Sequence, residues 1–238
     1  MSFRKWRSNE PTPAYQYSSY GDSLAVRNRV LRNTYWLLAL SMLPTVLGAW
    51  LGVHMHFSLF ASSPMLSFIA FMAIAFGFFY GIERTKNSGL GVVLLLGFTF
   101  FMGLMLSRMI EQILHFSNGA QLIMTAFGGT GLVFATMASV ATTSKRDFSG
   151  LSSWLFAGVI VILLAGIANI FLQMPALQIV ISLVAVAIFS AYILFDVQRI
   201  INGGETNYVT ATLAIYLDLY NVFVNLLALL GIFGGERD

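Results

Sequence analysis

Two aspartates near the C-terminus are the residues of this chain whose type and placement could do chemistry. Asp196 lies where an apolar segment meets a short polar turn, and Asp218 lies well inside the apolar segment that follows. A carboxylate at membrane depth costs about 2.5–3.5 kcal/mol on insertion scales, so a function or a buried partner is needed to keep it there. The two aspartates are therefore the first candidates for a functional site.

The composition indicates that the surroundings of these aspartates are lipid. Of the 238 residues, 58% are hydrophobic and only 10% are charged, whereas a soluble domain carries about 25% charged residues. The absence of cysteine excludes a disulfide framework, a cysteine–zinc site and a thiol nucleophile. The net charge of +3 does not indicate a nucleic-acid partner, because the excess Lys and Arg lie in loops where membrane topology requires them.

Seven apolar segments must position the two aspartates. Each has about the 20 residues that span a roughly 30 Å hydrocarbon core as a helix, and the runs are continuous, unlike the alternating strands of a barrel. We predict an all-α integral membrane protein with seven transmembrane helices, at 34–53, 64–82, 89–107, 119–141, 150–172, 176–197 and 208–232. This membrane domain, 34–232, follows a basic and largely disordered arm at 1–33 and precedes a short tail at 233–238.

The basic residues predict the orientation in the membrane. Eleven of the 13 Lys and Arg residues lie in the arm or in alternate loops that share its side, and the other two are Arg108 and Arg237. By the positive-inside rule the N-terminus is cytoplasmic and the C-terminus is outside, which agrees with an odd number of spans. The histidines then fall on the outer side, where we interpret His54 and His56 as interfacial residues, because two ligands without a neighbouring carboxylate make a weak metal site.

A stripe of small and polar residues runs along the last segment. Its members recur at spacings of three and four, which places them on one face of a helix: Ala211, Ala214, Asp218, Asn221, Asn225 and Ala228. In lipid such a stripe must face protein or water. Asn221, Asn225 and Asn169 suit either hydrogen-bonded packing between helices or the support of a polar site, whereas the desolvation cost of Asp218 favours a function.

Asp196 and Asp218 can approach each other in a hairpin. The glycines at 203–204 reverse the chain, so both aspartates are reached from the same membrane face, with Asp218 at most about 15 Å deep. Arg199 lies three residues after Asp196 and could pair with it instead, so an interfacial ion pair remains an alternative. Two carboxylates in a dry site cannot both ionise cheaply, and the pair would then share a proton near neutral pH.

This pairing predicts a proton-controlled gate. The protonated pair would latch two helices, while the ionised pair would repel and offer oxygen ligands to a hard cation such as Ca²⁺. Asp196 and Asp218 would be gate, proton sensor and transient Ca²⁺ ligands, with Ca²⁺ as the permeant or bound ion and no other cofactor. No enzyme is expected, because AFGGTG at 126–131 lacks the lysine of a phosphate loop and no HExxH, GxSxG or GxGD signature is present.

The sequence around these residues resembles the transmembrane Bax inhibitor motif family. The resemblance covers about 34–232 and rests on AYILFDVQRI at 191–200, GGETNY at 203–208, ATLAIYLDLYNVFVNLL at 211–227, AFGGTGLVF at 126–134 and GIANIF at 166–171. The GGETNY turn is most similar to the branch found in Gram-negative inner membranes. The resemblance implies seven helices with the last enclosed by the other six, and a pH-sensitive Ca²⁺ leak whose paired-aspartate sensor matches Asp196 and Asp218.

The resemblance also implies an arginine that can exchange with the aspartate pair, for which Arg84 is the nearest candidate, and an association with restraint of membrane quality-control proteases. Two functions therefore stay open. One is a passive, pH-sensitive leak for calcium or other cations. The other is a non-conducting regulatory protein that binds or restrains a membrane-bound protease or another partner through its lipid-facing helices or its arm. A proton-coupled transporter is disfavoured, because the segments show no obvious inverted repeat.

Overall fold

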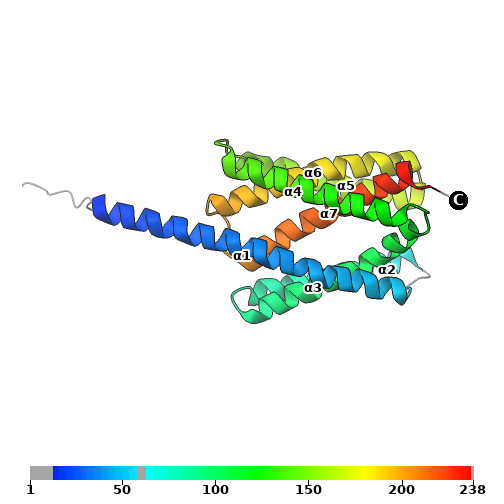
Figure 1. Ribbon diagram of the computed structural model, residues 1–238, viewed down its shortest axis with the longest axis horizontal. Helices are drawn as coiled ribbons and strands as arrows, with labels where there is room; N and C mark the ends of the chain where they lie inside the picture. Colours follow the sequence, from blue (N-terminus) through cyan, green and yellow to red (C-terminus); the bar gives the residue numbers. More distant parts are fainter. Residues whose placement is uncertain (1–12, 58–62, 237–238) are drawn as a thin grey trace, which may run out of the picture.

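The computed structural model describes residues 13–57 and 63–236, which contain seven α-helices and no strand (Figure 1). The helices are α1 (Pro13–His54), α2 (Pro64–Thr85), α3 (Gly89–Leu114), α4 (Gly119–Thr143), α5 (Ser152–Leu172), α6 (Pro175–Ile201) and α7 (Tyr208–Gly234), with a 3-10 turn, η1 (Ser149–Leu151), before α5. All seven are long and apolar enough to cross a membrane. The predicted all-α, seven-span fold is confirmed, while the sides on which the termini lie stay a prediction.

Helix starts follow the sequence signals closely. The starts of α2, α3, α4 and α7 lie at the predicted residues, where small or capping residues precede the apolar runs. The end of α5 lies at the predicted Leu172, the other helix ends lie later than predicted, and α3 continues past residue 107 to Leu114. Arg108 and Glu111 interrupt the apolar run but not the helix, because long charged side chains near a helix end can reach water.

The first helix begins much earlier than predicted. Residues 13–33, expected to be largely disordered, form the first part of α1 instead, and residues 1–12 lie outside the described residues. The helix is anchored near its middle, because Val30 is buried in the core and Nη1 of Arg27 donates to the carbonyl of Ile201 at 3.4 Å. Its N-terminal part projects beyond the other helices (Figure 1).

The last helix lies at the centre of the bundle. It packs against α6, α4, α1, α3 and α2, and Figure 1 shows it between the α4–α6 and α1–α3 pairs. Among the described residues α5 packs against α6 and η1 and does not reach α7. The last helix was expected to be enclosed by the other six helices, and five of these six pack against it. Its core-facing residues include Ile215, Tyr216 and Val222, which are almost fully buried.

The C-terminal end of α7 is tied to the turn between α3 and α4. Nδ2 of Asn118 donates to the carbonyl of Gly234 at 2.6 Å, and Oδ1 of the same side chain accepts from the backbone N–H of Glu236 at 3.2 Å. The backbone N–H of Ser117 donates to the carbonyl of Glu236 at 3.1 Å. The described part of the predicted tail, up to residue 236, is therefore held against the bundle.

Close backbone packing joins α1 to α3. A Cβ atom on Gly48 would lie 2.2 Å from the carbonyl oxygen of Phe100, and one on Gly103 would lie 2.1 Å from the carbonyl oxygen of Thr45. No side chain fits at these positions, so the glycines let the two helices approach each other, as small residues do in membrane bundles. The face of α1 that carries Gly48 therefore packs directly on the backbone of α3.

This close packing predicts an asymmetric effect of two identical substitutions. Gly48→Ala adds a methyl group against backbone atoms that cannot rotate away, so we expect a loss of about 1–3 kcal/mol in stability. Gly77→Ala is the control, because a Cβ atom there meets nothing within 4 Å and alanine favours the helix. Thermal unfolding in detergent should show a lower melting temperature for Gly48→Ala only, and equal melting temperatures would contradict the packing.

Candidate functional site

The hairpin between α6 and α7 is shaped by local capping. Gly203 adopts a positive φ of 77°, which glycine reaches without strain. Oδ1 of Asn207 accepts from the backbone N–H groups of Val209 and Thr210, so this side chain caps α7. Oε1 of Glu205 accepts from the N–H of Asn207 at 2.9 Å. These bonds fix the point from which α7 enters the bundle and therefore the depth of Asp218.

A second set of bonds fastens the same hairpin to a neighbouring loop. Nδ2 of Asn207 donates to the carbonyl of Lys86 at 3.2 Å and to Oδ1 of Asn87 at 2.8 Å. Lys86 and Asn87 lie between α2 and α3. The start of α7 is thus held to a loop that is more than a hundred residues away in the sequence.

The structure brings the two predicted aspartates together. The side chain of Asp196 on α6 lies close enough to that of Asp218 on α7 for the two to interact directly. Asp218 is only 5% exposed and Asp196 is half-buried. Because α6 continues past residue 197 to Ile201, Asp196 lies about 6 Å deeper than the predicted end of its span would place it, and this extension lets it approach Asp218.

A hydrogen bond between the two side chains would require a proton. An ionised carboxylate only accepts hydrogen bonds, so two carboxyl groups can be bonded to each other only when at least one of them is protonated. Oδ2 of Asp218 is buried and lacks a hydrogen-bond partner. Among the described residues it is the one buried side-chain nitrogen or oxygen atom in that state. Full ionisation of this pair would place two like charges in contact and leave a buried oxygen unsolvated.

Few other charges lie near the pair. Arg199 and Glu205 are close enough to act electrostatically on Asp196, but Arg199 is exposed and forms no ion pair with it. Within the described part of the chain the ion pairs are His56–Glu111 and Lys86–Glu83. The aspartates therefore lie beside each other and are not neutralised by a guanidinium group.

Two residues beside the pair were not singled out in the sequence. Tyr192 lies one turn before Asp196 on α6 and interacts electrostatically with both aspartates. Gln198 is buried, its Oε1 accepts from the N–H of Phe148, and its Nε2 donates to the carbonyl of Arg146, both at 2.7 Å. The helical spacing to Asp196 could have indicated Tyr192, but nothing local indicates that Gln198 fastens α6 to the loop between α4 and α5.

The polar stripe on α7 is largely satisfied within its own helix. Nδ2 of Asn221 donates to the carbonyl of Leu217, and Nδ2 of Asn225 donates to the carbonyl of Asn221, both at 2.8 Å. These amide donors therefore bond back along α7 and not to a neighbouring helix. The stripe lies on a different face of α7 from Tyr216 and Tyr220, whose hydroxyl groups bond to α1 and α3.

The other predicted polar residues lie elsewhere. Nε of Arg84 donates to the hydroxyl of Tyr80 at 3.1 Å, and its guanidinium lies over the same ring, so it is not paired with the aspartates. Asn169 is at the opposite end of the bundle, where Oδ1 accepts from the N–H of Met174 and Nδ2 donates to Gln178. Since Gln178 and Asp196 are 18 positions apart on α6, Asn169 is about 27 Å from the pair.

No group of three potential metal ligands converges in residues 13–57 and 63–236. Asp196 and Asp218 contribute two carboxyl groups, and the predicted transient Ca²⁺ site would need further oxygen ligands from the backbone or from water. His56 has a carboxylate neighbour that the sequence did not reveal, because its Nδ1 lies 2.6 Å from Oε1 of Glu111. His54 is exposed and bonds to the carbonyl of Trp50.

This arrangement defines a class of protein, an integral membrane bundle of seven helices. Its central helix carries a buried carboxyl group, that of Asp218, beside the acidic side chain of Asp196. The chain belongs to the Bax1-I family, because the model of that family, described as "Inhibitor of apoptosis-promoting Bax1", matches residues 27–235. The resemblance seen in the sequence is thereby confirmed.

The sequences of similar bacterial proteins agree with this membership. The chain is 38% identical over 209 residues to "Modulator of FtsH protease YccA" of Escherichia coli K12, which covers 88% of this chain and 92% of the relative. The same protein in E. coli O6:H1 is named "Inner membrane protein YccA". An uncharacterized membrane protein of Vibrio cholerae is 35% identical over 221 residues, covering 93% of this chain and 97% of the relative. The chain is accordingly a protein of the bacterial inner membrane.

The contacts of Gln198 predict a specific loss of stability. Gln198→Leu keeps most of the side-chain volume but leaves the N–H of Phe148 and the carbonyl of Arg146 without partners, which should cost about 1–3 kcal/mol. Gln112→Leu is the matched control, because Gln112 is exposed on α3 and a surface change usually stays within about 0.5 kcal/mol. Thermal unfolding in detergent should show a lower melting temperature for Gln198→Leu than for Gln112→Leu. Indistinguishable curves would contradict the stabilising role of the bonds from Gln198 to Phe148 and Arg146.

Proposed function

We propose that the chain is a passive, proton-controlled cation leak in which Asp196 and Asp218 form the latch. The observation that supports it is the close approach of these two carboxyl groups between α6 and α7, where Asp218 is buried. Loss of the shared proton converts an attractive contact into repulsion between like charges. The helices then separate at this point, and the carboxylate oxygens become ligands for a hard cation, for which Ca²⁺ is the first candidate.

The proposed opening is linked to pH with a definite sign. The latched state binds at least one proton more than the open state, so raising the pH favours opening. Loss of one proton changes an opening equilibrium by at most about tenfold per pH unit. Flux should therefore rise as the pH increases through neutrality, and by no more than that factor per unit if a single proton is released.

Calcium flux into proteoliposomes tests the latch. We expect wild-type flux to rise with pH and Asp218→Asn to lose this response, because an amide cannot ionise. Asp147→Asn is the matched control, because Asp147 is exposed in the loop between α4 and α5, and it should keep the wild-type response. No flux above that of protein-free liposomes at any pH would overturn the proposal, as would a wild-type pH response in Asp218→Asn.

A second candidate function is the modulation of a membrane-bound protease. The name of the 38% identical relative, "Modulator of FtsH protease YccA", favours it. The N-terminal part of α1 projects beyond the bundle and is the segment through which we expect such a partner to bind (Figure 1). In this role the chain need not conduct ions, and the aspartate pair would serve stability.

Turnover of a membrane substrate of an FtsH-type protease separates the two candidates. Under modulation, expression of the chain should slow degradation, and deletion of residues 1–24 should abolish the effect while leaving the span Ala25–His54 intact. Asp218→Asn should retain the effect, in contrast to its loss of pH response in the flux assay. Turnover that is unchanged by the wild-type chain would exclude modulation of that protease.

A further inference from the structure

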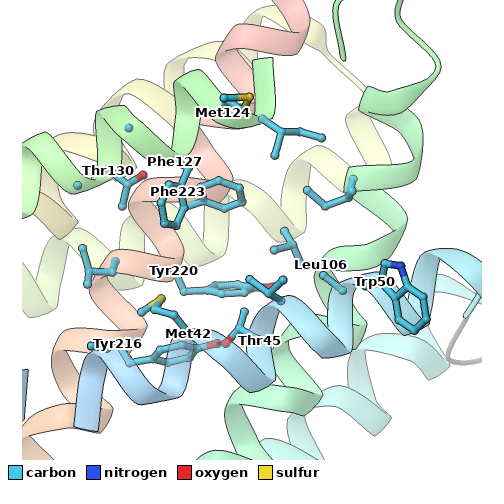
Figure 2. Close-up of a pocket in the computed structure, with 18 of the residues that line it drawn as sticks. Met42, Thr45, Trp50, Leu106, Met124, Phe127, Thr130, Tyr216, Tyr220 and Phe223 are labelled. Carbon is cyan, nitrogen blue, oxygen red and sulfur yellow. Dashed lines mark hydrogen bonds between the residues drawn. The ribbon is translucent and has the colours of Figure 1, made fainter. Parts of the chain in front are cut away.

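A cavity of about 760 Å³ lies between α1, α3, α4 and α7 (Figure 2). Its floor is formed by α7, at Tyr216, Leu219, Tyr220 and Phe223, which lie on a face other than that of Asp218. Met124 and Phe127 of α4 line one side of it, and Met42, Thr45 and Trp50 of α1 line the opposite side. It does not include either aspartate or any residue of the polar stripe.

The cavity opens sideways because its two walls remain apart. In the described part of the chain no Cα atom of α1 comes within 8 Å of one of α4. The walls meet through side chains at one end, where the ring of Tyr35 lies edge-on to that of Phe134 at a centroid distance of 5.7 Å. The remaining length is open between the helices, facing outward from the bundle.

Four hydroxyl groups of the lining are already engaged in hydrogen bonds. The hydroxyl of Thr45 is bonded to that of Tyr216 at 2.9 Å, the hydroxyl of Tyr220 donates to the carbonyl of Met102, and that of Thr130 donates to the carbonyl of Ala126. The rest of the lining is almost entirely carbon. A cavity of this kind does not hold water well, so its chemistry fits an apolar occupant and not an ion.

The walls continue directly into the membrane-facing surface. Val46 on the α1 wall is 61% exposed. On the α4 wall Phe127 is 62% exposed and Met124 is 74% exposed. In a chain that lives in the inner membrane, such side chains contact lipid tails. The opening is therefore continuous with the lipid interface, and the molecules that meet it first are the phospholipids of the bilayer.

The length and rim of the cavity fit one acyl chain. Its α1 wall runs from Tyr35 to His54, about 28 Å by helical rise, which exceeds the roughly 15 Å of hydrocarbon in one leaflet. At one end the rings of Trp50 and His54 lie 4.4 Å apart between centroids, tilted by 43°, and both residues are exposed. Tryptophan favours the membrane–water interface, so a lipid headgroup can remain at this rim while its tail enters the cavity.

We propose that this cavity binds one acyl chain of a phospholipid from the leaflet at the C-terminal end of α1. The chain enters between α1 and α4, and its tail lies on the Tyr216–Phe223 face of α7. The site is separate from the aspartate latch and does not depend on ion conduction. Lipid-tail binding here is a property of the closed bundle and needs no movement of a helix.

Photo-crosslinking in proteoliposomes tests the site. A phospholipid with a diazirine in one acyl chain is reconstituted with the full chain, irradiated, and the adducts are located by peptide mass spectrometry. We expect adducts on Leu219 or Phe223, which belong to the central helix and are reached by a tail only through the cavity. Adducts confined to outward residues such as Leu47 and Leu132, both strongly exposed, would overturn the proposal.

A pair of identical substitutions provides the control. Gly128 lines the cavity and a Cβ atom there meets nothing within 4 Å, so Gly128→Phe should narrow the cavity with no clash at Cβ. Gly77 has equal space on α2 but lies outside the cavity. Gly128→Phe should lower the α7 adducts several-fold and Gly77→Phe should not. Equal adduct yields in both variants would overturn the site.

Native mass spectrometry identifies the occupant. A monomer that retains phospholipid in the wild type and loses it in Gly128→Phe supports the proposal. A retained free fatty acid, or a lipid-free dimer that occupies the cleft with a helix of a second copy, would overturn it. If Gly128→Phe does not fold, Ala49→Phe narrows the cavity from the α1 wall, and the wild-type crosslinks stand without either variant.

Discussion

The cost of placing a carboxyl group inside an apolar bundle constrains the whole of this structure. Asp218 is nearly fully buried, and an isolated ionised carboxylate at such a place is expensive enough that the group must be neutral, paired or both. Asp196 is the neighbouring group that can provide the pairing, and a hydrogen bond between two carboxyl groups needs a proton. The central position of α7, the capped hairpin that feeds it and the helices around it together keep water and lipid away from this contact.

The helical period gives α7 two distinct faces. One carries Asp218 and the small and amide residues, whose asparagine donors bond back to carbonyls of α7 itself. The other carries aromatic rings that reach α1 and α3 through hydroxyl groups and form the floor of the lateral cavity. Because the asparagines satisfy their own donors, packing on the first face relies on small residues and on the carboxyl pair, not on a ladder of interhelical amide bonds.

Much of this fold could be predicted because lipid makes helix length and continuity visible in the sequence. The seven spans and the approach of Asp196 to Asp218 follow from apolar runs and one glycine turn. The peripheral position of α5 could not be predicted, since a helix that faces lipid is as apolar as one in the core. The clamp at Gln198 depends on the conformation of a loop 50 residues away, and the early start of α1 depends on tertiary contacts of Arg27 and Val30.

The two ends of α7 are both fastened to loops outside the hairpin, through Asn207 at its start and Asn118 at its end. Because both ends are held, α7 cannot shift along its own axis without breaking one of these two sets of hydrogen bonds. Separation of Asp218 from Asp196 is mechanically easier as a swing of α6, or as a twist of α7 about its axis, than as a stroke through the membrane. The geometry of the clamps thus selects the direction in which the bundle is compliant.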